Sequence, residues 1–234
     1  GVPASDAACA TFVVPALRAW MRTTTPPAEL RAVTSVFIDL RTARPPTRSW
    51  LAPTVGRVQG VLAARGGTVQ AVLADDKGLI CVAAFGLPSA VPLTAADPVL
   101  AGLELERVLQ DHGEEVSVAM GLVAGRAFFG CVGGRERTAL GLTGGTLNRA
   151  ARLMGLGPGI HCGPEVRRAA QGRVQFDEAV DHELKGIAGP VAVSRARCLR
   201  EPVAACVGRD SELNDAVAAA EQALAGGGGI LLWL

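Results

Sequence analysis

The stretch Gly141–Met154, GLTGGTLNRAARLM, predicts a glycine turn that leads directly into a helix. Gly144 and Gly145 allow a tight backbone turn that residues with a Cβ atom resist. Thr146 is expected to cap the helix, since its hydroxyl can accept a hydrogen bond from a free N–H of the first turn. The sequence therefore predicts a sharply bent entry into a helix that begins near residue 146.

The predicted helix presents an amide and a guanidinium on one face. Asn148 and Arg152 are four residues apart, so their side chains leave the helix on the same side. An arginine donates hydrogen bonds in a rigid fork that matches phosphate oxygens, and an asparagine beside it suits a ribose. A neighbouring face carries Leu147, Ala151 and Met154, which predict the stripe that packs on the core. The alternative is an ordinary surface helix on which the amide and the guanidinium are solvated.

Composition excludes several classes of function. The 234 residues are 49% hydrophobic and 19% charged, which is enough apolar material for a substantial core. A net charge of +1 and 4% aromatic residues provide neither the electrostatic footprint nor the stacking platforms of a nucleic-acid-binding protein. No apolar run reaches the roughly 20 residues that span a bilayer, so we expect no membrane span. The expected partners are therefore small molecules or proteins.

The cysteines indicate a reducing environment. The 6 cysteines form no C-x-x-C pair and no framework typical of secreted proteins. Cys81 and Cys131 lie inside apolar runs, where a cysteine usually acts as a small buried hydrophobic residue. The sequence therefore predicts an intracellular, cytoplasmic protein.

The first part of the chain predicts a strand, a helix and a hairpin. Ala32–Leu40 is rich in β-branched residues and is expected to form a central strand that ends at Asp39. Apolar residues recur at helical spacing across about Trp50–Arg65. Thr68–Leu73 and Leu79–Phe85 are apolar runs, and the ADDKG segment between them predicts a hairpin turn.

A second helix and a second hairpin are expected next. The helix is predicted over about Ala95–Gln110, and the hairpin joins Val116–Val123 to Arg126–Val132 through a turn at Ala124–Gly125. Shorter elements follow the glycine-turn helix: a strand near Ile160, a helix at Pro164–Gln171, and strands near Val174–Phe176 and Val191–Ala196. This order predicts an α+β domain over residues 28–200, with a largely antiparallel sheet covered by helices.

The two ends of the chain are expected to differ from this domain. Residues 1–27 predict an amphipathic segment and a linker that contains adjacent prolines. In residues 201–234, Asp210 or Ser211 is expected to cap a helix that runs to about Ala225. Glycines and the apolar run ILLWL follow, an order typical of P-loop NTPases, although the loop G-x-x-x-x-G-K-[ST] itself is absent. We interpret residues 201–234 as the truncated start of a P-loop NTPase module of the AAA or STAND type.

A series of short strings gives the chain a resemblance to a known family. In order they are ELRAVTSVFIDL, DDKG, AAFGLP, SVAMGLVAGRAFFGCVGG, GGTLNRAARLM, GIHC, ELKGIAGP and VGRDSEL. With these strings, residues 28–234 resemble the class III nucleotidyl cyclases, most closely the second catalytic half of soluble, bicarbonate-responsive adenylyl cyclase. The resemblance implies a ferredoxin-like class III cyclase domain over residues 28–200, which agrees with the predicted order of elements.

The resemblance also implies roles in an active site shared by two domains. In that family two cyclase domains pair head to tail around a nucleoside triphosphate, and one of them brings two aspartates that bind Mg²⁺ or Mn²⁺. The other brings a lysine that reads the base, an asparagine that orients the ribose and an arginine that stabilises the transition state. By position these residues are Lys77, Asn148 and Arg152. The reaction implied is attack of the ribose 3′-hydroxyl on the α-phosphate, which expels pyrophosphate and gives a cyclic nucleotide.

Two positions depart from the family's pattern. Where a polar side chain usually contacts the base, this chain has Gly141, so base choice would rest on Lys77 and on backbone groups near Leu142. The preference for ATP over GTP therefore stays open. Asp39 and Asp76 are candidate metal ligands. In the alternative that we favour, Asp39 ends a strand and Asp76 is a solvated turn residue, because Lys77 follows it directly.

The favoured hypothesis is one half of an adenylyl cyclase core. The chain would form cyclic AMP with an upstream half or a second copy, would make little product alone, and would rely on metal held mainly by its partner. The first alternative is a catalytically degenerate cyclase-homology module that regulates or dimerises. The others are a guanylyl cyclase half and a signalling NTPase that uses the cyclase domain as a sensor.

Overall fold

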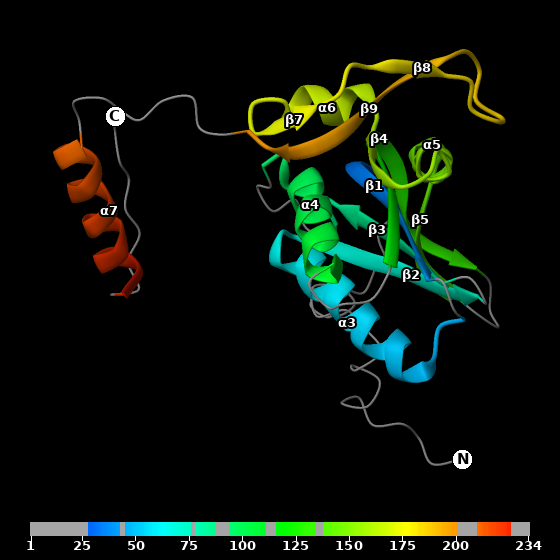
Figure 1. Ribbon diagram of the computed structural model, residues 1–234, viewed down its shortest axis with the longest axis horizontal. Coiled ribbons are helices and arrows are strands. Elements are labelled where there is room, and N and C mark those ends of the chain that lie inside the picture. The colour runs from blue at the N-terminus through cyan, green and yellow to red at the C-terminus, as the bar shows by residue number, and fades with distance from the viewer. Residues whose placement is uncertain are drawn as a thin grey trace. The chain divides into compact units, whose positions relative to one another are not determined.

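The computed structural model divides the chain into two compact units, residues 1–200 and 201–234 (Figure 1). The residues that it describes are 28–42, 45–75, 78–87, 94–110, 116–133, 138–200 and 210–225. The predicted segment 1–27 lies outside the described residues, so its amphipathic character stays a prediction.

The first unit is built on one mixed sheet. Its elements are β1 (Ala28–Thr42), α3 (Arg48–Ala64), β2 (Gly67–Asp75), β3 (Gly78–Phe85), α4 (Asp97–Gln110), β4 (Val116–Gly133), β5 (Thr138–Thr143), α5 (Gly145–Met154), β6 (Gly159–Cys162), α6 (Pro164–Ala170), β7 (Val174–Phe176), β8 (Val180–His182) and β9 (Val191–Leu199). The strand order is β2-β3-β1-β4-β6-β9-β7, with β5 paired to β4 and β8 to β9. The pair β4–β6 is parallel and the other strand pairs are antiparallel. The predicted α+β class with a largely antiparallel sheet is confirmed.

One face of the sheet packs against α3, α4 and α6. Side chains alternate between the two faces of a strand, and Val36, Ile38 and Leu40 of β1 all point to this face. They are fully buried in one cluster with Leu62 of α3 and Leu105 of α4. The large apolar area removed from water here supplies most of the domain's hydrophobic stabilisation.

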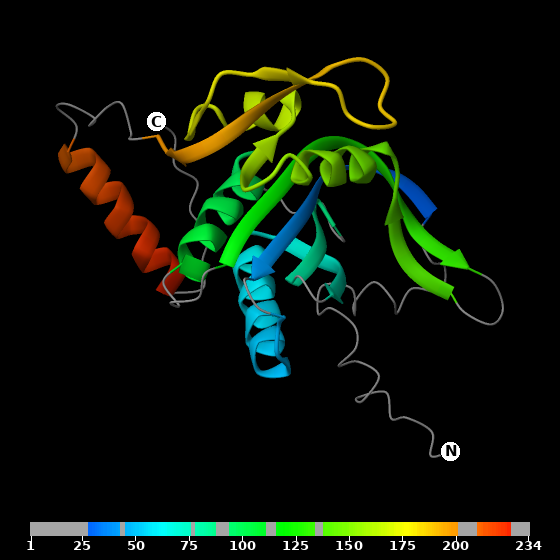
Figure 2. The same ribbon diagram turned by 45° about the vertical axis from the view of Figure 1, so that its right-hand side comes forward.

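The opposite face is covered by α5 and by the segment between β8 and β9. A smaller cluster there joins Leu153 of α5 to Val123 of β4, Val193 of β9 and Leu184, with Phe37 of β1 partly buried against it. Figures 1 and 2 show α3 and α4 on one side of the central strands and α5 on the other. Helix α5 therefore rests on a smaller cluster of apolar side chains than α3, α4 and α6 do.

Strand β4 corrects the prediction of a second hairpin. It is one continuous strand in place of the predicted turn at Ala124–Gly125, and it pairs with β1 along its length. Gly125 stands opposite Val33 in this ladder, and a Cβ atom on Gly125 would lie 2.8 Å from Cγ2 of Thr146. The glycine is thus required by the close approach of α5 and not by a turn. The last part of β4 instead pairs with β5, in a hairpin that the sequence did not predict.

Strand β1 is longer than the predicted strand. At its two ends Ala28 pairs with Gly130 and Thr42 pairs with Val116. Asp39 therefore lies inside the strand and not at its end, because the ladder to β4 continues past it. The predicted hairpin of β2 and β3 is confirmed, with Asp75 paired to Gly78.

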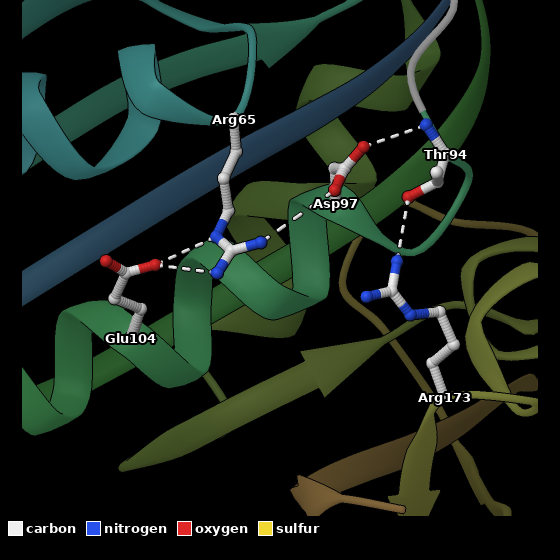
Figure 3. A network of polar contacts seen from close by, with 5 residues as sticks. All are labelled: Arg65, Thr94, Asp97, Glu104 and Arg173. Carbon is white, nitrogen blue, oxygen red and sulfur yellow. Dashed lines mark hydrogen bonds and ion pairs between the residues drawn. The ribbon is translucent and has the colours of Figure 1, made fainter. Parts of the chain in front are cut away.

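A network of polar contacts joins the end of α3, helix α4 and the segment that leads into β7 (Figure 3). Arg65, just after α3, donates from Nε and Nη2 to Oε2 of Glu104, both at 2.8 Å. Ahead of α4, the backbone N–H of Thr94 donates to Oδ2 of Asp97 at 2.8 Å, and Nη1 of Arg173 approaches the Thr94 hydroxyl at 3.4 Å. These contacts fix the end of α3 and the start of α4 against the segment that leads into β7.

Of the second unit, the structure describes α7 (Asp210–Ala225), which confirms the predicted helix. The glycines and the ILLWL run lie outside the described residues, so the start of an NTPase module stays a prediction. Among the described residues, no helix combines the length and the apolar character that crossing a membrane requires.

Candidate functional site

Helix α5 begins at a glycine, as predicted, but Thr146 does not cap it. The residue before the helix is Gly144, whose φ of 151° favours glycine, and no side chain caps the first turn. Thr146 lies inside the helix and is 9% exposed. Its Oγ1 accepts a hydrogen bond from Oγ of Ser35 on β1 at 3.0 Å. The cap prediction is therefore wrong, because the helix already begins at Gly145 and the hydroxyl of Thr146 faces the sheet.

The backbone of α5 packs directly on β4. A Cβ atom on Gly121 of β4 would collide with the carbonyl oxygen of Ala150. The buried residues of α5 are Thr146, Ala150 and Leu153, and the predicted stripe of Leu147, Ala151 and Met154 is only half-buried. The predicted core stripe is thus displaced by one residue, because Thr146 and Ala150 are the residues that lie against Gly125 and Gly121 of β4.

Asn148 and Arg152 both lie on the exposed side of α5. Both side chains are exposed, and they project one helical turn apart, about 6 Å along the axis. Neither is buried against the body of its own domain, so both can contact a molecule or a surface outside it. An exposed amide beside an exposed guanidinium provides donors for a hydroxyl and for phosphate oxygens.

Gly141 and Leu142 lie on β5, next to the start of α5. Gly141 pairs with Gly130 of β4 and Leu142 pairs with Phe129. A Cβ atom on Gly141 would meet no heavy atom within 4 Å, so this position opens on free space. Leu142 packs on the small cluster that contains Phe129. The backbone at residues 141 and 142 therefore borders the entry to α5.

The predicted base-reading turn between β2 and β3 is placed only through its flanking strands. Lys77 and Asp76 lie outside the described residues, so the position of the Lys77 side chain relative to α5 stays a prediction. Gly78, which follows the turn, pairs with Arg41 of β1 and with Asp75 of β2. The strands that flank the turn therefore meet beside the carboxyl end of β1.

Asp39 is a carboxylate that is already paired. It is 8% exposed, and its Oδ2 accepts a hydrogen bond from Nε of Arg41 at 2.8 Å. Carboxylate oxygens suit Mg²⁺ or Mn²⁺, but here a guanidinium compensates the charge. In the described part of the chain, no three His, Cys, Asp or Glu side chains gather as metal ligands. These residues therefore do not form a complete metal site by themselves.

The chain is similar to known cyclases in sequence and in fold. No protein-family description matches the chain. Adenylate cyclase type 10 of Rattus norvegicus is 28% identical over 186 residues, which cover 75% of this chain and 11% of that protein. The adenylyl cyclase CyaB from P. aeruginosa shares the fold with a TM-score of 0.63 and 16% identity, covering 76% of this chain and 100% of that chain. The first unit therefore shares the fold of a solved adenylyl cyclase.

A second solved structure supports the same fold for the first unit. The guanylate cyclase domain of RhGC from Catenaria anguillulae, in complex with GTP, matches with a TM-score of 0.64 and 19% identity. The match covers 74% of this chain and all of that chain. Both adenylyl and guanylyl cyclases thus share the fold. The chain spans only about a tenth of the length of this curated relative.

The first unit brings some of the predicted residues together. Asn148 and Arg152 share the exposed face of α5, and Gly141 and Leu142 border its entry. Their roles toward a nucleotide stay predictions. Ser35 was not among the predicted site residues, although a serine within a run of β-branched and apolar residues is a signal for a buried polar contact.

Two cavities lie away from α5. One of about 490 Å³ is lined by Leu103 and Arg107 of α4 and by Leu199 of β9, among others. Another of about 410 Å³ lies between α6 and β9, beside Arg167 and the buried Ser194. Asn148 and Arg152 line neither of these two cavities.

Burial shifts the pKa of several groups in the domain. It raises the pKa of the Cys81 thiol to about 11 and also raises that of Cys162, so both thiols are protonated. Cys131 is exposed, which corrects the expectation that it is buried, because the strand turns this residue toward solvent. Burial lowers the pKa of His161, and the nearby Arg195 lowers it further, while carbonyl hydrogen bonds oppose the shift. The imidazole is therefore held in its neutral form.

Proposed function

We propose that the first unit is one half of a class III adenylyl cyclase core that forms cyclic AMP and pyrophosphate from ATP. The observation that carries the proposal is the exposed amide and guanidinium of Asn148 and Arg152, one turn apart on a helix seated on glycines of β4. This arrangement lies in a domain with the class III cyclase fold. Because both side chains face outward, a second domain is needed to enclose the nucleotide.

In the proposed reaction, Asn148 holds the ribose and Arg152 donates hydrogen bonds to the phosphate oxygens. The ribose 3′-oxygen attacks the α-phosphorus and loses its proton, while the bond from that phosphorus to the pyrophosphate oxygen breaks. Negative charge grows on the phosphate oxygens in the transition state. A guanidinium fork already in position stabilises that charge without reorganising. Lys77 would read the base from the turn between β2 and β3.

The proposed metal ions, Mg²⁺ or Mn²⁺, would neutralise phosphate charge and would be held mainly by the partner domain. Support comes from Asp39, whose carboxylate is engaged by Arg41 within this domain. The partner would be a second cyclase domain, either an upstream half or a second copy. A guanylyl cyclase domain of the same fold from Blastocladiella emersonii is described as dimeric. A cytoplasmic setting also stays a proposal.

The test is to assay the purified chain alone and then mixed with a cyclase domain that carries two metal-binding aspartates. ATP and GTP are each supplied with Mg²⁺ or Mn²⁺, and the cyclic product is measured. We expect little product from the chain alone and clear cyclic AMP formation from the mixture. Robust turnover by the chain alone would contradict its assignment as the half without the metal aspartates. Turnover of GTP in place of ATP would identify a guanylyl cyclase half.

A specific observation favours one alternative, a degenerate module that binds a partner without turnover. Gly141 offers no side chain to a base, and the space next to it is open. A mixture that forms a stable complex, seen by analytical ultracentrifugation, but makes no cyclic nucleotide would support this alternative.

A further inference from the structure

Two buried hydroxyl groups link β1 to the first turn of α5. Oγ of Ser35 donates to Oγ1 of Thr146 at 3.0 Å, and the residues are 0% and 9% exposed. The two residues are 111 positions apart in sequence. A hydroxyl this deeply buried loses its contacts with water, so a lost partner leaves an unsatisfied polar group. The hydrogen bond therefore specifies one placement of the helix on the strand.

Apart from the packing of Leu147 on a small apolar cluster, the Ser35–Thr146 contact is the side-chain restraint that the described residues show for the first turn of α5. Its cap residue is Gly144, which has no side chain, and no side chain caps the first turn. Gly144 and Gly145 can also adopt many backbone conformations, so the entry to the helix is not stiff by itself. The contact from Ser35 to Thr146 thus restrains the helix where its chain connection is weakest.

The glycines of β4 and the hydrogen bond fix different degrees of freedom. Gly121 and Gly125 let the backbone of α5 approach β4 closely, and a Cβ atom at Gly125 would lie 2.8 Å from Cγ2 of Thr146. A smooth surface without side chains sets the depth of the helix but resists sliding and rotation weakly. A directional hydrogen bond resists both. Thr146 precedes Asn148 by two residues and Arg152 by six, so its position sets the direction of both side chains.

We propose that Ser35 is a positioning residue that holds Asn148 and Arg152 in the orientation needed for nucleotide chemistry. It acts through Thr146 and touches neither the nucleotide nor the metal. The inference rests on the proposed function for its effect on turnover, and on the Ser35–Thr146 contact alone for its effect on the helix. A displacement of about 1 Å at a reacting centre can cost on the order of 10²-fold in rate, so a small helix shift is enough.

The test compares Ser35→Ala, Thr146→Val, the double variant and Thr146→Ser. Thr146→Ser keeps the hydroxyl and serves as the conservative rescue. The matched control is Thr68→Val on β2, which removes another buried hydroxyl that donates to the carbonyl of Leu87 at 3.2 Å, away from α5. Three quantities are measured: kcat and KM of the assembled pair, the free energy of unfolding, and hydrogen exchange of the α5 amides.

We expect Ser35→Ala and Thr146→Val to lower kcat by about 10- to 10²-fold with KM changed less, and to speed exchange in the first turn of α5. Thr146→Ser should keep both near the wild-type values. Thr68→Val should lower stability without changing kcat or α5 exchange. In the double variant neither hydroxyl is left unpaired, so stability should recover while kcat stays low. A double variant with recovered stability and a low kcat would distinguish a positioning role of Ser35 from a role in stabilising the fold.

Recovery of kcat in the double variant, or an equal loss of kcat in Thr68→Val, would overturn the proposal. So would normal α5 exchange in Ser35→Ala. A wild-type pair without any turnover would contradict the proposed function. The exchange measurements would then decide alone whether Ser35 positions the helix.

Discussion

The two faces of the central sheet differ in how they are covered. On one face α3, α4 and α6 bury a continuous apolar cluster that includes Leu62, Leu105 and Ile160. On the other face α5 rests on the glycines of β4, beside the buried pair of Ser35 and Thr146. The first face is held by apolar area, which has no preferred direction, and the second by close backbone contact and one directional hydrogen bond.

The difference suggests that stability and the proposed function are divided between the faces. A core with many contacts tolerates small changes in any one of them. A helix that presents Asn148 and Arg152 to another domain needs a defined position more than it needs a large buried area. Changes on the first face should therefore alter the free energy of unfolding, and changes on the second face should alter turnover.

The largest effect is expected from Leu105→Ala in the cluster of the first face. Leu105 is fully buried on α4, and its replacement should cost about 2–5 kcal/mol of unfolding free energy, since a cavity remains. Urea unfolding measures this change. The control is Leu30→Ala on β1, where the side chain is 59% exposed and the cost should stay within about 0.5 kcal/mol. Loss of kcat in the folded Leu105 variant, with stability unchanged, would contradict the division between the faces.

The next effect is expected from Arg152→Ala on the second face. Turnover of the assembled pair should fall on the order of 10²–10³-fold, because one donor to the developing charge is lost. The melting temperature should hardly change, since Arg152 is exposed. Arg149→Ala is the matched control, because it removes an equally exposed arginine from the same helix. Equal turnover in the two variants would remove Arg152 from the mechanism.

A smaller effect is expected from adding a methyl group to the glycine under α5. Gly121→Ala should cost about 1–3 kcal/mol of stability, because the new Cβ atom collides with the Ala150 carbonyl and displaces the helix. Gly141→Ala on β5 should change stability by less than about 0.5 kcal/mol, since its Cβ atom meets open space. Thermal unfolding of both variants measures the contrast. Equal stability would show that α5 is not seated on β4 as described.

The smallest effect is expected from pH. Burial lowers the pKa of His161 below its ordinary value of 6.5, so as pH falls the unfolded chain takes up the proton first. The stability that His161 contributes is therefore present above pH 6.5 and is lost as the pH falls through the lowered pKa of the folded state. Urea unfolding between pH 7.5 and pH 5 measures the loss, and His161→Gln should show a shallower dependence. Stability that rises as the pH falls, in a manner abolished by His161→Gln, would contradict this assignment.

Local patterns in the sequence predicted most of the elements correctly. The helices α3 and α4, the hairpin pairing of β2 with β3, and the glycine entry to α5 are all confirmed. These features depend on neighbouring residues, so a local pattern is enough to predict them. The same patterns placed Asn148 and Arg152 on one exposed face, which the structure bears out in position.

Glycine and hydroxyl residues with distant partners were misread. Ala124–Gly125 resembles a turn, but Gly125 makes room for Thr146. Thr146 resembles a helix cap, but its hydroxyl accepts a hydrogen bond from Ser35. In each case the residue contacts a segment that is far away in the chain, and no pattern in the neighbouring sequence identifies that segment.

The sequence by itself determined the α+β class of the domain, most of its elements and the exposed amide and guanidinium of α5. Only the tertiary structure decided how that helix is held: which face it buries, which glycines it rests on and which hydroxyl restrains its first turn. The physical reason is the distance along the sequence between the residues that interact. Helical and strand periodicity follow from adjacent residues, whereas the seat of α5 comes from β1 and β4, which meet it only after the sheet has assembled.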